Sequence, residues 1–458
     1  MKNIAKAPVW DGPIDEAGVE SLLVLARKYR AYDDKGRYLH WHEFRFRPTE
    51  DDRKVAWWAV KFARLQLLRP IGLAAEHGKS FLLCMPDPMQ RILHRIDRMC
   101  PLQDEELFSD EAPLTVNRYD KLYYLATSLL EEAITSSQLE GASTTRRIAK
   151  EMLREGRQPR NKSEQMIFNN FELMQAVKEN GQNPLSLELI KEFHRIAIDK
   201  CGENNAVPGE LRLTDDVYIE DLEGEVFHTP PKATLLERRL ERLCRFANMN
   251  HDGEGGEANF FLHPIVKATI LHFMIGYEHP FADGNGRTAR AIFYWHMLKC
   301  GYSVFEFISI SRLLNLAPLK YFRAFLYVED DDFDLTYFVA HQLDVVDRAV
   351  QGFLDYVKEK KRERLEFTSQ LKSLGAKGDF NYRQLELLRS MRKHPGKPYT
   401  AKEVAFDYNV SANTAREDLK RIAQFGYAVE AQVAGTKERA YIALAGLPSG
   451  QSDLRRAV

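Results

Sequence analysis

The sequence contains 458 residues, of which 44% are hydrophobic and 29% are charged, and its formal net charge is -1. A chain of this length and balance can bury a large core and predicts roughly two to four domains of common size. The near-neutral net charge does not indicate a polyanion or a membrane as partner, although a local basic face is still possible.

Cysteine usage and hydropathy narrow the class of protein. Widely spaced cysteines without a Cys-x-x-Cys pair argue against a zinc ribbon and against a disulfide framework. We therefore expect buried, reduced thiols at Cys84, Cys100, Cys201, Cys244 and Cys300. The amino terminus lacks a sustained apolar stretch, and no later run approaches the roughly 20 apolar residues that span a bilayer. These features predict a cytoplasmic protein with no membrane partner.

Residues 1–110 predict an α/β region whose role the sequence leaves open. Apolar spacing indicates helices at Asp15 to Tyr29 and at Thr49 to Leu68, and the alternating stretch YLHWHEFRFR between them is typical of a strand. His40 and His42 lie two residues apart in that stretch, without a carboxylate or cysteine pattern. Packing is therefore favoured over metal binding for both histidines.

Residues 111–360 show a helical pattern almost throughout, with apolar residues three and four apart and breaks at Gly, Pro and Asn. The main exception is Val217 to His228, where apolar residues alternate on either side of an acidic turn that contains glycine, which predicts a short hairpin. The charged run at 358–367 predicts a continuing helix with a solvated face. Gly375 to Gly378 marks the expected end of this domain.

Residues 375–446 predict a winged helix-turn-helix. Apolar spacing and turn residues indicate helices at Tyr382 to Lys393, Ala401 to Asp407 and Ala412 to Gln424, followed by two strand-like runs around Gly435. We find no internal repeat and no low-complexity segment that would favour another architecture.

The third of these helices is the usual groove reader in such domains. We expect its exposed side to carry Ser411, Asn413, Thr414, Arg416 and Lys420. Glu417 and Asp418 dilute the positive charge that binding to DNA phosphates requires. DNA and a protein partner therefore both stay open for this module.

The segment HPFADGNGRTAR, from His279 to Arg290, holds the residues with the clearest chemistry. Apolar residues at helical spacing precede and follow it, so we expect a loop between two core helices. Those residues are Val266, Ile270, Phe273, Met274 and Tyr277 before the segment and Ala289, Ile292, Phe293 and Met297 after it. The backbone N–H groups of Gly284, Asn285 and Gly286, with the start of the second helix, form a ready site for phosphate.

Four side chains of the segment fit phosphate chemistry. Arg287 and Arg290 lie on the first turn of the second helix, where a planar fork of donors can grip phosphate oxygens. Asp283 is a natural ligand for Mg²⁺, which prefers one or two carboxylates plus substrate oxygens. His279, with an unperturbed pKa near about 6.5, can accept a proton from an attacking hydroxyl.

The segment resembles, at every defined position, the HPFx(D/E)GNGRxxR signature of the Fic family of protein adenylyltransferases. The resemblance implies a mainly α fold, with a Fic-type helical core and a β-hairpin flap. It also implies ATP as substrate, Mg²⁺ at Asp283, His279 as general base, an anion hole at Gly284 to Gly286, and phosphate binding by Arg287 and Arg290. Phe281 is similar to a core anchor of the family and is expected to have no chemical role.

The resemblance extends over roughly residues 114–347. PGELR followed by VYIEDLEGEVFHTPP is similar to the family's flap, which implies that Val217, Tyr218 and Ile219 clamp an extended target segment through its backbone. Tyr321 in LKYFRAF resembles a family position near the adenine, although a lone aromatic residue is more often part of the core.

The stretch TSSQLEGA resembles the inhibitory (S/T)xxxE(G/N) motif of many Fic proteins. Ser136 and Glu140 are four residues apart, on one face of a helix expected around 117–141. The resemblance implies that the Glu140 carboxylate pairs with Arg290 and occupies the space of the ATP γ-phosphate. The alternative is an ordinary surface glutamate near a glycine stop.

These features predict an autoinhibited protein adenylyltransferase that moves AMP onto a Tyr, Ser or Thr hydroxyl of a target protein or of itself. Two alternatives stay open. One is a Fic enzyme with another donor or with AMP-removing activity, and the other is an ATP-sensing transcription regulator that binds DNA. The sequence also leaves a homodimer open.

Overall fold

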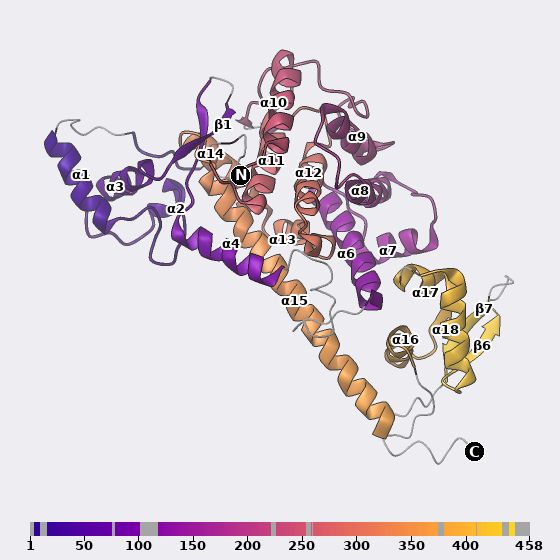
Figure 1. The fold of residues 1–458 in the computed structure, drawn as a ribbon. Helices are drawn as coiled ribbons and strands as arrows, with labels where there is room; N and C mark the ends of the chain where they lie inside the picture. The colour runs from indigo at the N-terminus through magenta and orange to yellow at the C-terminus, as the bar shows by residue number, and fades with distance from the viewer. Residues whose placement is uncertain are drawn as a thin grey trace.

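The computed structural model describes residues 4–9, 16–75, 78–100, 118–220, 226–252, 258, 260–373, 380–408, 410–432 and 439–444. This part of the chain is mainly helical, as predicted, and its strands form three small antiparallel sheets (Figure 1). None of the helices described is both long enough and apolar enough to cross a membrane.

Two helices of the N-terminal region match the prediction, whereas the stretch between them does not. α1 spans Glu16–Lys28 and α3 spans Arg53–Leu65. The predicted strand is wrong, because Trp41–Phe44 form a single helical turn, α2. That turn brings both aromatic rings onto the buried Trp57, at centroid distances of 5.9 and 5.5 Å. A strand would point residues three apart to opposite faces.

His40 has the packing role that the sequence favours. Its ring is buried and stacks on Tyr327 with centroids 4.3 Å apart, and its Nε2 lies 3.0 Å from a carboxylate oxygen of Asp330. The Nδ1 of His42 accepts a hydrogen bond from the backbone of Ala5 at 2.9 Å. The contacts of His40 connect the N-terminal region to α14, which spans Pro318–Asp330.

A hairpin not predicted from the sequence follows α3. β1 (Arg69–Ala74) pairs with β2 (Ser80–Leu83), and α4 (Asp87–Met99) comes next. Phe81 of β2 contacts Phe273 and Tyr277 at centroid distances of 5.7 and 5.1 Å. The N-terminal region therefore shares one hydrophobic core with the helices around the motif.

The two helices predicted on either side of the motif are present as α11 (Pro264–Glu278) and α12 (Asn285–Lys299). Nearly all of their side chains are buried, so the buried surface is wider than the predicted apolar stripes. Neighbouring helices cover the remaining faces. The other central helices are α6 (Arg118–Leu139), α7 (Arg146–Glu155), α8 (Lys162–Glu179), α9 (Leu187–Ile198), α10 (Leu236–Asn248), α13 (Ile310–Leu316), α14 and α15 (Thr336–Ser373), with 3₁₀ turns at Ala233–Leu235 and Ser303–Glu306.

The predicted hairpin before the motif is also present. β3 (Ile219–Glu220) pairs antiparallel with β4 (Val226–His228), and residues 221–225 between them lie outside the described residues. Just upstream, the backbone N–H of Arg212 donates to the carbonyl of Pro280 at 2.9 Å. This bond holds the start of the hairpin segment against the motif loop.

The charged run at 358–367 is part of α15, as predicted, and this long helix leads from the helical body to the last part of the chain (Figure 1). We call residues 380–444 the C-terminal module. Its elements are α16 (Tyr382–Lys393), β5 (Pro398–Thr400), α17 (Ala401–Tyr408), α18 (Ala412–Gln424), β6 (Ala428–Gln432) and β7 (Arg439–Ala443).

The predicted helices and strands of the C-terminal module are present, and β5 is an addition. The strand order is β5-β7-β6, and the module encloses a hydrophobic cluster of its own around Leu388 and Leu419. The expected boundary at Gly375 to Gly378 and the turn around Gly435 lie outside the described residues.

One residue expected on the outward face of α18 is not there. Asp418 is buried and accepts a hydrogen bond from Arg383 of α16 at 2.6 Å, because a cation on the neighbouring helix compensates its charge. Arg416, Glu417 and Lys420 are exposed. The outward face of α18 is therefore less acidic than the sequence predicts.

Candidate functional site

A cavity of about 320 Å³ lies where the end of α11, the start of α12, the turn after α6 and the helix α14 meet. This volume falls at the lower end of the range of about 300–1,000 Å³ that is typical of small-molecule pockets. Its lining residues are Leu139, Glu140, His228, Gly276, Tyr277, His279, Asn285, Gly286, Arg290, Pro318, Leu319, Tyr321, Phe322, Phe325, Leu326 and Glu329. Most of the residues predicted to bind phosphate or transfer a proton are therefore in one place.

The loop between α11 and α12 holds a fixed and unusual backbone. His279 ends α11 in the left-handed region, at φ 43°, and its N–H donates to the carbonyl of Ile275 at 3.0 Å. Gly284 has φ 79°, and a Cβ there would lie 2.4 Å from the Ile198 side chain, so only glycine fits. Asn285 clamps the loop, since its side-chain amide both donates to and accepts from the backbone of Phe281. Phe281 itself is fully buried, as expected of a core anchor.

The start of α12 offers an anion site. Gly284 is its N-cap and supplies no side-chain hydrogen bond, so the first backbone N–H groups have no partner within the helix. The helix dipole adds partial positive charge at this end. A Cβ on Gly286 would lie 2.3 Å from Oε1 of Glu140, which means that this carboxylate rests against the glycine backbone. Glu140 thus places a negative charge where an anionic ligand would bind.

Arg290 is fully buried beside this carboxylate. Its Nη2 lies 2.9 Å from Oε1 of Glu140, its Nε donates to Oγ of Ser136 at 2.8 Å, and its Nη2 also donates to the Ser136 carbonyl at 3.0 Å. The predicted contact between Glu140 and Arg290 is therefore present, and Ser136 orients the guanidinium. Nη1 of Arg290 is buried and has no hydrogen-bond partner within the described part of the chain. One strong donor is thus left for a ligand.

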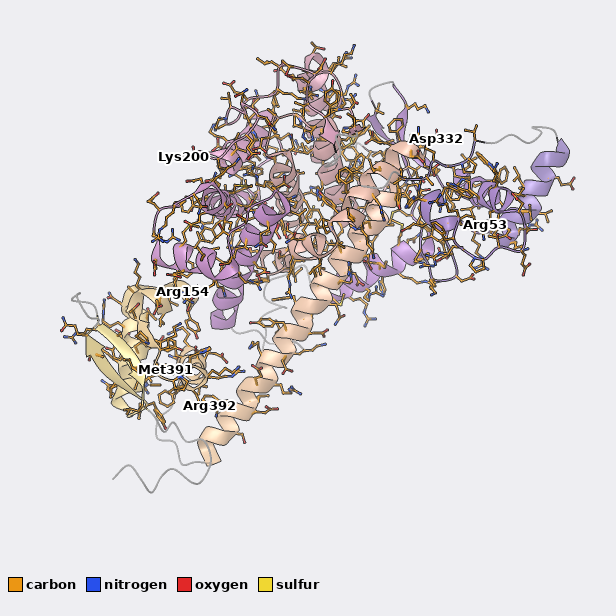
Figure 2. All side chains as sticks on the ribbon, turned by 180° about the vertical axis from the view of Figure 1, so that it is seen from behind. Arg53, Arg154, Lys200, Asp332, Met391 and Arg392 are labelled. Atoms are coloured by element: carbon orange, nitrogen blue, oxygen red, sulfur yellow. The ribbon has the colours of Figure 1, made fainter. Side chains whose placement is uncertain are left out.

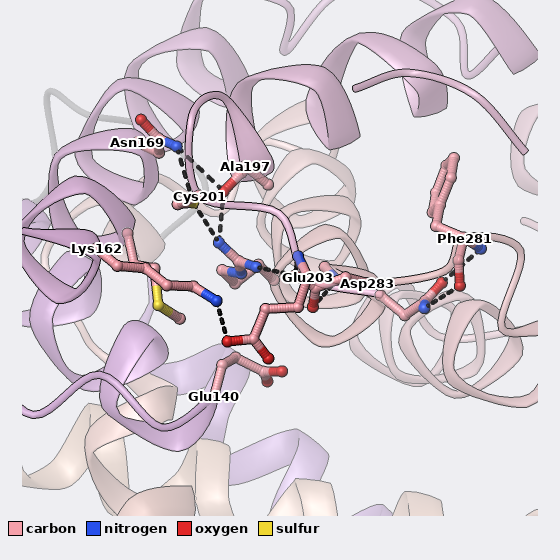
Figure 3. A network of polar contacts seen from close by, with 12 residues as sticks. Glu140, Lys162, Asn169, Ala197, Cys201, Glu203, Phe281 and Asp283 are labelled. Atoms are coloured by element: carbon pink, nitrogen blue, oxygen red, sulfur yellow. Dashed lines mark hydrogen bonds and ion pairs between the residues drawn. The ribbon is translucent and has the colours of Figure 1, made fainter. Parts of the chain in front are cut away.

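Arg287 points away from Arg290. Its Nη1 donates to the carbonyl of Ala197, at the end of α9, at 2.5 Å, and its Nη2 lies 3.6 Å from Oδ2 of Asp283 (Figure 3). Arg290 therefore faces the cavity, whereas Arg287 connects the loop to α9. Arg287 thus contacts Asp283 as well as α9, and its predicted contact with phosphate stays a prediction.

Asp283 is held in place by backbone donors. Oδ1 accepts from the N–H of Gly284 at 2.6 Å, and Oδ2 accepts from the N–H of Glu203 at 2.9 Å (Figure 3). The side chain is 23% exposed, so a ligand can reach it. Among the described residues, no group of three or more His, Cys, Asp or Glu side chains is placed so that it could hold a metal ion. A single carboxylate fits Mg²⁺ that takes its other ligands from phosphate and water.

The ring of His279 is prepared to act as a base. Its Nδ1 lies 3.4 Å from the Gly276 carbonyl, a long contact that favours the proton on Nδ1 and leaves Nε2 to accept another. Burial, and next the charge of His228, lower the pKa of His279 to about 4. The imidazole is therefore neutral at pH 7, as a general base must be.

His228 and Glu329 also line the cavity, and no local pattern in the sequence pointed to either residue. Nδ1 of His228 lies 2.8 Å from the Glu329 carboxylate, and Nε2 lies 2.7 Å from the Tyr277 carbonyl. The carbonyl and an ionised carboxylate can only accept, so the two contacts favour the ring with a proton on both nitrogens. Burial acts against this charge, but the ion pair with Glu329 raises the pKa of His228 overall. These two contacts anchor β4 to α14 and α11, and positive charge on His228 disfavours a second positive charge on His279.

Two further residues position the loop from outside the motif. His194 of α9 stacks on Phe281 with centroids 3.6 Å apart, accepts from the N–H of Gly209 at 3.1 Å, and donates from Nε2 to the Asp283 carbonyl at 2.9 Å. Arg212 donates from Nε to the His279 carbonyl at 2.9 Å. Each lies far from the motif in sequence, so helical or strand periodicity could not have identified its role.

The remaining predicted residues lie around the cavity and beside it. Tyr321 lines the cavity, and its hydroxyl lies 2.8 Å from Nε2 of His272. Val217 and Tyr218 line a second groove, of about 670 Å³, together with Ala282 of the motif loop. Ile219 begins β3 next to them. The flap residues thus adjoin the loop, outside the cavity.

A family model of known proteins matches the part of the chain that contains most of this site. Residues 184–297 match the model of the Fic/DOC family, so this part of the chain is a Fic/DOC domain. The matched span includes His194, Arg212, His228 and the motif loop, whereas Glu140 and Tyr321 lie outside it.

Three similar proteins place this match in context. Protein adenylyltransferase Fic of Drosophila melanogaster is 28% identical over 118 residues, which are 26% of this chain and 21% of that protein. Protein adenylyltransferase fic-1 of Caenorhabditis briggsae is 34% identical over 123 residues, which are 25% of this chain and 22% of that protein. A solved Fic family protein from Desulfovibrio desulfuricans G20 is 17% identical, with a TM-score of 0.45, and the match covers 79% of this chain and 95% of that chain. The similarity in sequence thus spans only about a fifth of the curated relatives.

Proposed function

From the Fic/DOC domain at residues 184–297, we propose that the chain is a protein adenylyltransferase, which moves AMP from ATP to a hydroxyl group of a target protein or of itself. The observation that carries the proposal is the arrangement in one cavity of the neutral His279, the buried Arg290 and the uncapped start of α12. A base and an anion site are what this transfer needs.

In the proposed reaction, the target hydroxyl oxygen attacks the α-phosphorus of ATP. Nε2 of His279 accepts the hydroxyl proton, the bond between the α-phosphorus and the bridging oxygen breaks, and pyrophosphate leaves. The N–H groups at the start of α12 and the free Nη1 of Arg290 hold the phosphate oxygens. Asp283 would hold Mg²⁺, which neutralises charge on the phosphates when bound.

The proposed target docks in the groove beside the loop. Tyr218 is 47% exposed and lines this groove with Val217 and Ala282. An extended segment of the target would add backbone hydrogen bonds along the short hairpin, a mode that reads the backbone more than the side chains. The groove adjoins the motif loop, so a hydroxyl on that segment would reach His279.

We further propose that Glu140 inhibits this reaction. Its carboxylate occupies the anion site at Gly286 and pairs with Arg290, so the γ-phosphate of ATP must compete with it. ATP that binds while Glu140 stays in place would sit in a pose unsuited to in-line attack on the α-phosphate. Activity would then be set by which anion Arg290 holds.

Labelled ATP tests the proposed transfer. We expect the Glu140→Gly variant, incubated with Mg²⁺, to incorporate label from the α-phosphate of ATP into protein and none from the γ-phosphate, because the AMP moiety is retained and pyrophosphate leaves. Incorporation is measured by autoradiography of the separated protein. Equal labelling from the γ-phosphate would indicate phosphoryl transfer and contradict the proposal.

The lowered pKa of His279 predicts the pH dependence of the reaction. Because this pKa is about 4, the neutral base is present above that pH and is lost as the pH falls through it. We expect kcat/KM of Glu140→Gly to stay level from pH 8 down to about 5, whereas an unperturbed histidine would bend the profile near about 6.5. Initial rates of AMP incorporation across this range check it. A bend near 6.5 would show that burial does not control the base.

A further inference from the structure

The C-terminal module contacts the helical body of the molecule through α17. This helix packs on both α6 and α7, the two helices joined by the turn that carries Glu140 (Figure 1). Figure 2 shows Arg154 of α7 at the boundary with the module. The contact is therefore made with the segment that places a carboxylate in the anion site.

An apolar side chain of α17 completes a cluster beneath α6. Phe406 packs against a small hydrophobic cluster that is separate from the main core. The buried members of the cluster are Leu130, Ala133, Ile134, Ala149, Met152, Leu153 and Ile167. Three of these residues lie on α6 and three on α7, so the module covers the place where the two helices meet.

Two polar contacts fix the same boundary. Arg154 forms an ion pair with Asp407, and both side chains are less than one third exposed. Nζ of Lys402 donates to the carbonyl of Glu155 at 2.6 Å, at the end of α7 where the helix dipole favours a cation. Burial raises the pKa of Asp407 although Arg154 lies beside it. A charge reversal on either side would therefore leave two like charges in a site with little water.

The face of α6 that meets this cluster borders the face that holds Arg290. Leu130, Ala133 and Ile134 follow the three- and four-residue spacing of one helical face. Ser136 and Glu140, three and seven residues after Ala133, lie beside this face and contact Arg290. The end of α6 therefore contacts both the cluster that the C-terminal module covers and the arginine of the cavity.

We propose that docking of the C-terminal module keeps Glu140 in the anion site, so that separation of the module from α6 and α7 activates the enzyme. This inference rests on the proposed function, since it describes how the same site is regulated. Without α17, the outer side of the cluster is exposed and α7 loses both polar contacts. The end of α6 then opens more often, and Arg290 becomes available to ATP.

Charge reversal tests the docking. We expect Arg154→Glu and Asp407→Arg each to raise AMP transfer roughly 10-fold, within the usual range of coupling between sites, and to tighten ATP binding. Hydrogen exchange of residues 128–156 should become faster. The double variant Arg154→Glu with Asp407→Arg restores an ion pair and should return all three readouts toward wild type. In a Glu140→Gly background, Asp407→Arg should add nothing.

Matched controls separate docking from charge. Arg147→Glu on the exposed side of α7 and Glu417→Arg on the exposed side of α18 make the same charge changes away from the boundary, and we expect no effect from either. Unchanged exchange in both single reversals would overturn the docking. Faster exchange without more AMP transfer, in a chain whose Glu140→Gly variant is active, would overturn the coupling.

Failure of the proposed function has a different signature. If Glu140→Gly transfers no AMP, the regulatory contact can still be tested. The two measurements are then hydrogen exchange and the affinity for ATP, determined by calorimetry. Faster exchange at residues 128–156 with tighter ATP binding would support it, and no change in ATP affinity would overturn it.

Discussion

Replacement of Glu140 by glycine is expected to raise AMP transfer about 100-fold. The carboxylate and ATP compete for Arg290, and breaking a buried ion pair of this kind costs about 3 kcal/mol or more. At about 1.4 kcal/mol per tenfold change, removal of the competitor is worth roughly two orders of magnitude in occupancy of the productive pose. Glycine at this position also removes the oxygen that contacts the backbone of Gly286. The initial rate of AMP incorporation measures the effect.

Two matched variants show whether the charge or the side chain itself inhibits. Glu140→Gln keeps the size of the side chain and removes its charge, so we expect it to activate less than glycine does. Glu179→Gly makes the same change at the exposed end of α8 and should leave the rate unchanged. A wild-type rate in Glu140→Gly, with Arg290 intact, would show that Glu140 is only a surface residue.

Removal of His279 is expected to produce the largest loss. In the Glu140→Gly background, His279→Ala should lower the rate of AMP transfer by about 10² to 10⁴, the usual contribution of a general base. ATP affinity should change little, because the anion site at α12 and Arg290 do not depend on the imidazole. The two quantities are measured by AMP incorporation and by calorimetry.

The backbone at His279 requires a second variant. Its φ of 43° is costly for alanine, whereas asparagine tolerates the left-handed region. His279→Asn should therefore keep the fold and still lose activity, since its amide cannot accept the proton. His94→Ala, at an exposed position of α4, serves as the control. If both His279 variants transfer AMP at the parent rate, the assignment of the base is wrong.

Competition at Arg290 connects these expectations with the docking of the C-terminal module. Ser136 of α6 and Glu140 in the turn after it hold the guanidinium, and the module packs on α6 and α7, the helices joined by that turn. A change far from the cavity can therefore alter which anion Arg290 binds. The charge-reversal variants and Glu140→Gly should thus act on the same step, so their effects on AMP transfer should not be additive.

The sequence predicted features that depend on neighbours along the chain. Helices α11 and α12 were identified because apolar side chains recur at helical spacing, and the hairpin at 217–228 because they alternate around a turn. The prediction failed at 38–47, where alternation suggested a strand. The packing of Trp41 and Phe44 on Trp57 selects a helical turn there instead.

Contacts between distant residues could not be predicted from such patterns. His228 meets Glu329 across 101 positions, and His194 meets the Asp283 carbonyl across 89. Asp418 was expected on the outward face of α18, yet it is buried and pairs with Arg383 of another helix. The spacing of apolar residues within one helix does not show which other helix packs against it.

By itself, the sequence determined the loop from His279 to Arg290, the two helices that flank it and the chemical character of its side chains, because these follow from residue type and short-range spacing. The resemblance of TSSQLEGA to an inhibitory motif also pointed to Glu140. Only the tertiary structure decided that Arg290 faces the cavity while Arg287 turns to α9, that His228 pairs with Glu329, and that α17 packs on α6. The reason is physical. Charge, burial and pKa depend on which groups are in contact, and packing between segments far apart in the sequence determines those contacts.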